Sequence, residues 1–466
     1  MARRSGTAGA STDVSRRTAL AIVLAGAIVA PLDTAVNVAF PAITDAFGLE
    51  LPAIRWVVIL YMLTYGGMML IGGRLGDLYG YRRVFAIGLG MVAAAFTACA
   101  LAPNYAVLLA ARIAQGVGMA FVLGCGPALA LSLFDEAART RVLGYYASMF
   151  ALGTALGPLM GGVLVGPFGW QSVFWMRVPL ALAVLALLRW VPAAPQAGNR
   201  AFDTPGAALL ALWTGCLVLA LALPWSAALW LGLVALAAFV AFVVRASRIP
   251  EPILKPALFG DLRFTILNLL NVAVNLAAFA VLLLGPYYFV RVAGLGALGV
   301  GLLLGAWAGG TLAGAALAER LGRRFGLQQV GSLGILLSVA GLVFAGFWDA
   351  QTTLVAAGVA LLLQGFGVGL FQVAYADGVV AALPREDRGV AGSLTMLTRM
   401  LGIVGGATLF AALFRDGEGA ALAAGLAAGD AFLEGFRYAF RWAAAGLGAI
   451  LLVALLPNWA WRRPRL

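Results

Sequence analysis

The sequence predicts an all-α polytopic membrane protein built from two similar halves. Hydrophobic residues make up 63% of its 466 residues, charged residues make up 11%, and the mean hydropathy is +0.98. Because a soluble domain carries about 25% charged residues, most of this chain is expected to lie in a lipid bilayer. A charged hairpin, Gly73–Arg83, recurs in weaker form about half a chain later as Leu317–Arg324. Such a repeat in an apolar protein indicates a duplicated helix bundle.

Fourteen apolar segments are long enough to cross a bilayer as helices, which takes about 20 residues each. We expect them at 18–43, 54–75, 84–102, 106–133, 141–165, 171–191, 205–223, 227–244, 263–289, 298–318, 328–348, 352–376, 390–414 and 436–457. The division between the seventh and eighth is the weakest, because only residues 224–226 separate them. The first segment lacks a small-residue cleavage site, so it is expected to remain as the first span.

Basic residues fall in alternate connections between these segments, as an even number of spans requires. After an N-terminus with four arginines, the inner connections hold Arg82, Arg83, Arg139, Arg141, Arg245, Arg248, Lys255, Arg320, Arg323, Arg324, Arg385, Arg388, Arg462, Arg463 and Arg465. The outer connections carry almost no positive charge before 415–441, which mixes both signs. Since cytoplasmic loops are enriched in Lys and Arg, both termini are expected in the cytoplasm, and the protein in the cell (inner or plasma) membrane.

The repeat divides the chain into six, two and six spans. Besides the hairpins, the motif Gln115–Gly118 is echoed by Gln364–Gly367 at a similar offset. We therefore expect an N-terminal six-helix bundle at 1–191, a linker with two extra helices at 192–260, and a C-terminal six-helix bundle at 261–466.

Several classes of function are excluded by composition. The chain has no histidine, and Cys99, Cys125 and Cys216 lie in apolar runs without a CxxC spacing, so we expect no metal site and no histidine-based catalysis. The net charge of +12 comes from short clusters between apolar segments, so nucleic-acid binding is not expected. A membrane-embedded acyl or glycosyl transferase is the alternative from another class. Because no sizeable extramembrane domain is present, the chain is not expected to be an enzyme.

Asp33 is the one carboxylate that falls well inside an expected span. A charge at mid-bilayer costs roughly 2.5–3.5 kcal/mol, so Asp33 should face the bundle interior and bind a partner. A buried carboxyl can bind and release protons; the alternative is a structural hydrogen bond between helices. Arg112 is the expected partner, and Gln115 and Asn37 lie at similar depths, so the four could form one polar cluster. Arg112 could otherwise be a packing charge that is already satisfied.

Further polar side chains in the spans are candidates for a cavity wall. Asn268, Asn271 and Asn275 are spaced three and four apart and so share one helix face. The offset that relates the hairpins, taken from Gly80 to Gly322, also relates Asp33 to Asn275. These amides could line a cavity or join helices by hydrogen bonds.

Two more arginines and two tyrosines extend this set. Arg177 and Arg399 lie inside spans, and Tyr61 and Tyr65 form a polar face on the second span. The arginines could bind an anionic or polar group of a substrate. Alternatively, they could extend to the membrane surface or pair with the backbone.

Two sets of residues suggest a mechanical role. The hairpins carry Gly73, Asp77, Gly80, Arg82, Arg83, Glu319, Arg320 and Arg324. Their carboxylates can pair with basic groups or helix N-termini, and such contacts could lock one access state of the bundle. The fifth span carries Gly153, Gly157, Pro158, Gly161 and Gly162. This pattern predicts a kink and a close-packing surface.

Together these motifs resemble the major facilitator superfamily, and within it the fourteen-span drug:proton antiporters (the EmrB/QacA-like subfamily). The first hairpin is similar to that superfamily's G-x-L-a-D-r-x-G-r-k loop, and Leu32–Pro41 to the subfamily's L-D-x-T-x-V-N-V-A-L-P. Arg112–Gly118 matches R-x-x-Q-G-x-G, and Gly153–Gly162 matches the antiporter-associated G-x-x-x-G-P-x-x-G-G. Pro384–Arg399 resembles the subfamily's loop into the thirteenth span.

The resemblance implies a major facilitator fold with alternating access, in which proton entry drives export of small amphipathic molecules or drugs. It implies that Asp33 is the protonation site, Arg112 its modulator and the Asp77 hairpin a conformational latch. The expected partners are a small-molecule substrate, protons and the bilayer, with the proton gradient as energy source and no cofactor. A symporter of the same fold, an exporter of lipid-like or anionic metabolites, and an accessory export partner remain alternatives.

Two departures from the subfamily concern the cargo. The spans carry one buried acid against three arginines, and Arg177 stands where the subfamily often has asparagine. Both favour anionic or amphipathic cargo over a broad range of cationic drugs.

Overall fold

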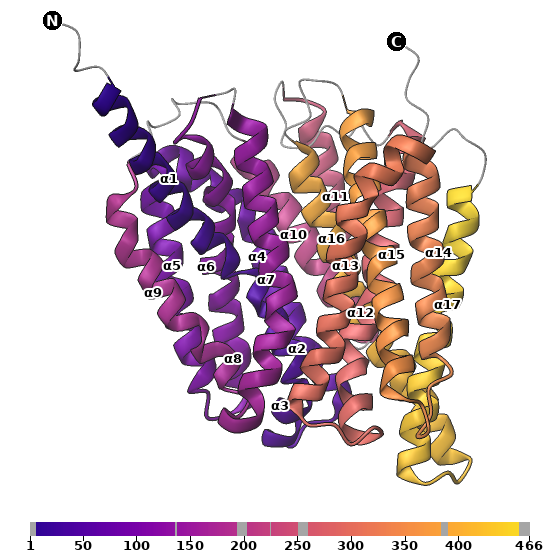
Figure 1. The fold of residues 1–466 in the computed structure, drawn as a ribbon. Coiled ribbons are helices and arrows are strands. Elements are labelled where there is room, and N and C mark those ends of the chain that lie inside the picture. Colours follow the sequence, from indigo (N-terminus) through magenta and orange to yellow (C-terminus); the bar gives the residue numbers. More distant parts are fainter. Residues whose placement is uncertain are drawn as a thin grey trace, which may run out of the picture.

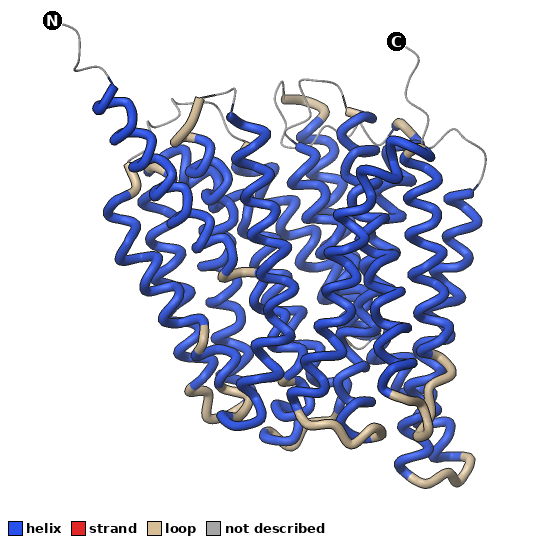
Figure 2. Tube along the Cα trace, in the orientation of Figure 1, coloured by secondary structure: helices blue, strands red, loops and turns tan. Residues whose placement is uncertain are grey.

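A computed structural model of the chain describes residues 6–135, 138–192, 203–223, 225–249, 260–383 and 390–455. Within these ranges every regular element is a helix (Figure 2). The long helices run side by side in two groups, one from each half of the sequence (Figure 1). Most of the linker at 192–200, the loop at 384–389 and the basic positions 255 and 462–465 lie outside the described residues.

Within the described residues, the N-terminal half holds the helices α1 to α9. Their bounds, with those of the 3-10 helices η1, η2 and η4, are α1 Gly6–Ile28, η1 Pro31–Thr34, α2 Ala35–Val38, α3 Phe40–Ala46, η2 Leu51–Ile54, α4 Arg55–Tyr79, α5 Tyr81–Ala100, α6 Tyr105–Leu131, α7 Arg139–Phe168, α8 Ser172–Trp175, α9 Arg177–Leu187 and η4 Leu188–Trp190. We call the end of the bundle where α1 begins the near end, and the opposite end the far end.

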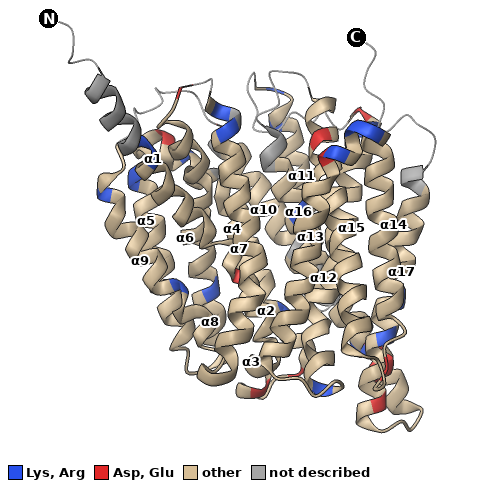
Figure 3. Ribbon diagram, in the orientation of Figure 1, with Lys and Arg blue, Asp and Glu red and all other residues tan. Residues whose placement is uncertain are grey.

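The rest of the chain holds two intervening helices and the C-terminal half. Their bounds are α10 Thr204–Ala222, α11 Trp225–Ala246, α12 Leu262–Arg291, α13 Ala297–Phe325, α14 Leu327–Ala345, α15 Leu354–Ala382, α16 Val390–Ala423 and α17 Ala428–Leu455. Charged residues lie mostly towards the two ends of the bundle, and few lie between them (Figure 3). This distribution is expected of helices that span an apolar layer.

The expected count of fourteen spans is not supported. Among the described residues, twelve helical stretches are long and apolar enough to cross a membrane. The segments expected at 205–223 and 436–457 do not meet that criterion, although α10 and α17 occupy them. Among the side chains that the structure describes, α10 has an apolar stretch at Pro205–Leu217, and the first half of α17 carries charges of both signs.

The α16–α17 connection also differs from expectation. We expected a charged outer segment at 415–441, but α16 continues to Ala423 and α17 begins at Ala428. The turn between them includes Gly425 in the left-handed region, with φ +86°. The two helices therefore extend together beyond the rest of the far end (Figure 1).

The two intervening helices pack at the seam between the halves. Helix α10 contacts α4 of the N-terminal half and α16 of the C-terminal half. It also packs along α11, and Arg245 Nε of α11 lies 2.7 Å from Asp203 Oδ1 at the start of α10. The ion pair fixes α10 and α11 to each other.

The hairpin turns show a different correspondence between the two halves from the one that the sequence predicts. Gly80 joins α4 to α5 with φ +92°, and Gly326 joins α13 to α14 with φ +91°. Because only glycine adopts such angles without strain, Gly326 is the counterpart of Gly80, whereas Gly322 lies inside α13.

Candidate functional site

The first span is broken where Asp33 lies. We expected one continuous helix over 18–43, but α1 ends at Ile28 and is followed by the short elements η1, α2 and α3. Pro31 begins η1, and Pro41 lies in the first turn of α3, so both occupy positions that proline tolerates. Around Asp33 the regular α-helix thus gives way to a tighter 3-10 turn, while the residues at its boundaries keep right-handed helical angles.

Helix α7 supports the broken segment. A Cβ on Gly153 would meet Pro31 Cγ at 2.6 Å, and one on Gly161 would meet the Ala35 carbonyl oxygen at 2.9 Å. Thr34 Oγ1 donates hydrogen bonds to the carbonyls of Pro31 at 2.9 Å and Thr154 at 3.2 Å. The close-packing surface expected on the fifth span is therefore present, and it holds the segment that carries Asp33.

Asp33 binds two arginines. Arg112 Nη1 donates to Asp33 Oδ1 at 2.7 Å and Arg112 Nη2 to Oδ2 at 2.8 Å, a two-pronged contact. Arg177 Nη1 donates to Oδ1 at 2.6 Å, and Gln115 Nε2 donates to the same oxygen at 3.0 Å. The expected contacts of Asp33 with Arg112 and Gln115 are thus present. The roles of these residues in proton coupling remain predictions.

The position of Arg177 differs from expectation. We expected it in the wall of a substrate cavity, but it is fully buried and lines neither of the cavities described below. Its Nε donates to the Val173 carbonyl at 2.9 Å, and its guanidinium lies 4.2 Å from the Phe96 ring centre. Its other terminal nitrogen, Nη2, has no hydrogen-bond partner among the described residues. Arg177 is therefore a second ligand of Asp33.

Arg112 also makes contacts besides those with Asp33. It is fully buried, its Nε donates to the Val57 carbonyl at 2.9 Å, and its guanidinium lies 4.3 Å from the ring centre of Tyr61. Stacking on an aromatic face stabilises a buried guanidinium. With Asp33 and Arg177 it forms what we call the Asp33 triad. The triad holds one carboxylate and two guanidiniums, and so carries a net charge of +1 when Asp33 is ionised.

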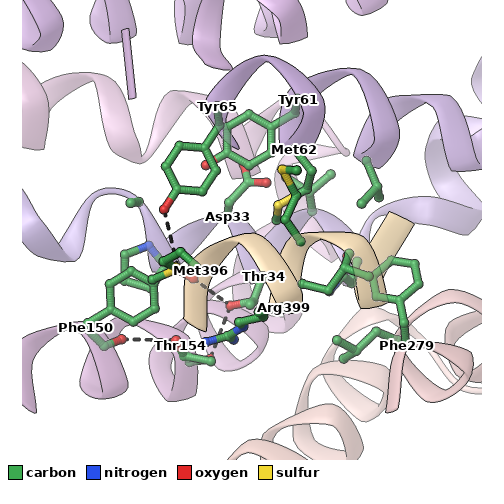
Figure 4. A pocket seen from close by; sticks show the side chains of 18 of the residues that line it. Asp33, Thr34, Tyr61, Met62, Tyr65, Phe150, Thr154, Phe279, Met396 and Arg399 are labelled. Atoms are coloured by element: carbon green, nitrogen blue, oxygen red, sulfur yellow. Dashed lines mark hydrogen bonds between the residues drawn. The ribbon is translucent and has the colours of Figure 1, made fainter. Parts of the chain in front are cut away.

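Two adjoining cavities lie between the halves, next to the triad. One of about 890 Å³ is lined by Asp33, Asn37, Tyr61, Tyr65 and Arg112 on the N-terminal side (Figure 4). The other has about 880 Å³ of empty space, part of it open to solvent, and reaches Asn275 and Gln372 of the C-terminal half. Their shared wall consists of Phe150, Thr154, Phe279, Leu282, Trp307, Arg399 and Ile403.

The asparagine stripe of α12 forms a hydrogen-bonded network within the C-terminal half. Asn271 Nδ2 donates to Thr398 Oγ1 at 2.8 Å, and Asn275 Nδ2 donates to Asn271 Oδ1 at 2.9 Å. Tyr375 donates to Asn268 Oδ1 at 2.9 Å. Among the three asparagines only Asn275 lines a cavity. The stripe therefore joins helices, and only one end of it reaches the cavity.

Several cavity residues were not expected from the sequence. Gln372, Trp307, Phe150 and Phe279 line the second cavity. Apolar and aromatic residues give no signal in an apolar helix that separates a cavity wall from a lipid-facing side. Gln372 Nε2 donates to Asn271 Oδ1 at 3.2 Å, and its polarity could have identified it.

The hairpin residues bond within their own halves. Tyr81 donates to Asp77 Oδ1, and Arg82 Nη1 donates to the Val191 carbonyl at 2.8 Å. Glu319 pairs with Arg323 at 2.9 Å on the surface of α13. The remaining arginines expected in the latch, Arg83, Arg320 and Arg324, are exposed. None of the contacts described for these residues crosses between halves, and their role as latches stays a prediction.

Three comparisons place this geometry among known proteins. A family model described as Major Facilitator Superfamily matches residues 22–407. The chain is 31% identical over 378 residues to the multidrug resistance protein Stp of Mycobacterium tuberculosis (strain CDC 1551 / Oshkosh), covering 79% of this chain and 70% of that protein. It is 30% identical over 403 residues to the methylenomycin A resistance protein of Streptomyces coelicolor, covering 85% of each. It is 27% identical over 398 residues to the riboflavin transporter RibZ of Clostridioides difficile, covering 85% and 87%.

Solved structures agree in fold. The nucleoside transporter NupG superposes with a TM-score of 0.69 at 12% identity, covering 95% of this chain and 100% of that one. A D-xylose–proton symporter superposes with a TM-score of 0.65 at 18% identity, covering 96% and 97%. Two helical halves, a cavity between them and a match over most of the length lead to one conclusion. The chain belongs to the Major Facilitator Superfamily and is a membrane transporter of small molecules, not an enzyme.

Proposed function

We propose that the protein is a proton-coupled antiporter that exports small amphipathic molecules in exchange for protons. The observation that carries this proposal is the position of Asp33. It is the one carboxylate in the walls of the two cavities, and it is bound to buried groups of α6 and α9. Several relatives are named for resistance to drugs or antibiotics, which supports export.

The proposed coupling runs through the break in the first span. A proton on Asp33 removes the charge that Arg112 and Arg177 bind, so it loosens the contacts that hold η1 to α6 and α9. Segment η1 packs on α7, and α7 packs on α13 of the other half. Protonation thereby biases how the halves meet, and by linkage cargo binding biases protonation in return.

The proposal includes the membrane arrangement of the fourteen-span drug:proton antiporters. Helices α10 and α17 then cross the membrane besides the twelve stretches that meet the length and hydropathy criterion. With the arginine-rich hairpins on the cytoplasmic side, the near end faces the cytoplasm of a cell (inner or plasma) membrane. The proton gradient supplies the energy.

The test is transport into vesicles loaded with acid, using variants of the Asp33 triad. Riboflavin, methylenomycin A and tetracenomycin C, the compounds named for its relatives, are the first cargos to try. Wild-type protein is expected to take up at least one of them and to raise the internal pH as protons leave, and cargo uptake should be lost once an uncoupler has collapsed the gradient. The variant Asp33→Asn/Arg177→Gln should lose at least tenfold of the proton-driven rate. It keeps the triad's net charge of +1 but has no acid to titrate.

Two outcomes would count against the proposal. If the double variant still exchanges cargo for protons at the wild-type rate, Asp33 is not the coupling site. If cargo entry acidifies the vesicle interior, the protein is a symporter of the same fold. The sign of the pH change therefore separates antiport from symport.

A further inference from the structure

Arg399 is a cation in the cavity wall without an acidic partner. It lies in α16 and lines both cavities, as do Phe279, Trp307 and Ile403, and Figure 4 shows its side chain in the wall of the first cavity. Among the described residues no carboxylate pairs with its guanidinium, whereas Arg112 and Arg177 both bind Asp33. A guanidinium in apolar surroundings is costly unless its donors are satisfied. Its donors are therefore directed to what fills the cavity.

The charges around the cavities add up to an excess of positive charge. The described residues that line them include a single carboxylate, Asp33, and both of its oxygens are already bound by guanidinium groups. The triad contributes +1 and Arg399 contributes another +1. Electrostatic interactions are strong and poorly screened where water is sparse. A positively charged cargo that enters this space would therefore be repelled.

We propose that the cavity excludes cations and binds its cargo through acceptor oxygens at Arg399. The inference rests on the proposed function, because it assigns the substrate class of the same site. A guanidinium offers five N–H donors in a plane and suits carboxylate or carbonyl oxygens. Much of the rest of the wall is aromatic or apolar, including Phe150, Phe279 and Trp307, and fits a flat apolar body. The cargo is thus an aromatic amphiphile that bears oxygens and no positive charge.

The test uses three probes that share one aromatic body and differ in charge. Radiolabelled 2-naphthoate, its neutral methyl ester and 2-naphthylmethylammonium are equilibrated with purified protein in nanodiscs, and binding to empty nanodiscs is subtracted. Wild-type protein is expected to bind naphthoate and the ester at least about tenfold more tightly than the ammonium, the effect of one charge-assisted contact. Tighter binding of naphthoate than of the ester identifies a carboxylate ligand. Equal binding identifies neutral oxygens.

Substitutions of Arg399 show whether this residue determines the order of the three binding affinities. Arg399→Gln should weaken naphthoate binding about tenfold and strengthen binding of the ammonium, while Arg399→Lys should keep the wild-type order. Arg415→Gln is the matched control, because Arg415 lies on the same helix, is exposed and lines neither cavity. It should leave all three affinities unchanged. Gel filtration and thermal unfolding confirm that each variant is folded.

The inference is overturned if wild-type protein binds the ammonium as tightly as the other probes, or binds none of the three. It is also overturned if Arg399→Gln weakens all three equally. Binding is measured without a proton gradient, so this result is separate from the vesicle experiment. If wild-type protein shows no proton-driven export but binds the three probes with the expected order of affinities, only the antiport proposal is refuted. If it exports cargo in exchange for protons but binds the ammonium most tightly, only this inference is refuted.

Discussion

Asp33 neutralises only one of the two guanidiniums that it binds, and both are shielded from solvent. A buried ion pair contributes little net stability, but removing one partner leaves a buried charge uncompensated and costs about 3–5 kcal/mol. The triad therefore has a structural effect as well as the proposed role in coupling. Experiments on Asp33 need to separate the two.

Asp33→Asn alone is expected to destabilise the protein by about 3–5 kcal/mol, because Arg112 and Arg177 lose their counter-charge. Adding Arg177→Gln should recover part of that loss, since one unpaired charge is then absent. The measurement is thermal unfolding of the purified variants in detergent, analysed as a double-mutant cycle. Equal melting temperatures for wild type and Asp33→Asn would show that the arginines do not depend on this carboxylate.

At the scale of single residues, the sequence predicts how deep a residue lies in the membrane but not the direction in which its side chain points. Asp33, Arg112 and Gln115 could be assigned to one cluster because the rise per residue gives their levels in the membrane. Arg177 was missed as a ligand of Asp33 because its direction depends on the break between α8 and α9 at Met176. Pro179, which follows Phe174–Val178, is a signal for an interrupted helix, but nothing in the sequence gives the direction of the Arg177 side chain.

At the scale of elements, the glycines of α7 serve two surfaces. Gly153, Gly157 and Gly161 pack on the segment around Asp33, whereas Gly162 packs on α13. A Cβ on Gly162 would lie 2.9 Å from Gly301 Cα and 3.1 Å from the Ala297 carbonyl oxygen. Backbone atoms cannot move aside as flexible side chains can. One helix thus links the segment that carries Asp33 to the opposite half of the molecule.

Gly162→Ala should force α7 away from α13, at a cost of about 1–3 kcal/mol for overpacking. The expected result is a lower melting temperature and slower transport. Gly144→Ala is the matched control, because Gly144 lies in the same helix and nothing lies within 4 Å of an added Cβ. It should be neutral or slightly stabilising, as alanine favours a helix over glycine. Equal effects of the two substitutions would refute the role of the close contact.

Element boundaries were predictable where composition changes and not where charged residues continue a helix. The expected limits of the apolar helices mostly fall close to the observed ones. The charged segment 415–441 looked like a loop, but Glu434 and Arg437 pair along α17 at 2.8 Å. Arg437 also donates to the Trp348 carbonyl at 2.8 Å. These contacts satisfy the charges within helical structure, and hydropathy does not detect them.

At the scale of the whole molecule, the described contacts between the halves include several at the far end. Tyr287 of α12 lies 2.5 Å from Thr44 Oγ1 of α3, oxygen to oxygen, and its hydroxyl also reaches the Phe40 carbonyl at 3.4 Å. The Gly162–Gly301 contact adds to this closure. At the near end the hairpins bond within their own halves. The far end is therefore closed in this structure, and Tyr287 forms part of that closure.

The overall two-half architecture followed from the repeat, but the relation between the halves did not. Repeats in sequence indicate that two bundles exist, whereas their contact depends on side chains such as Tyr287 and Thr44 that have no counterpart in the motifs. The register also shifted, since Gly326 rather than Gly322 corresponds to Gly80. A weak sequence repeat matches the charged residues of the two hairpins, whereas the glycine φ angles at the turns match the ends of the helices.

Tyr287→Phe should shift the protein towards states that are open at the far end. It removes a buried hydroxyl that bonds across the halves, worth about 0.5–1.5 kcal/mol, so the ratio of closed to open forms should fall roughly twofold to tenfold. Spin labels on cysteines at the exposed positions Ala46 and Gln351 report the separation of the halves there. The native cysteines are buried. Tyr288→Phe is the control, because the Tyr288 hydroxyl bonds to the Asp349 carbonyl within its own half. A longer label distance in both variants, or in neither, would show that the Tyr287–Thr44 contact does not hold the far end closed.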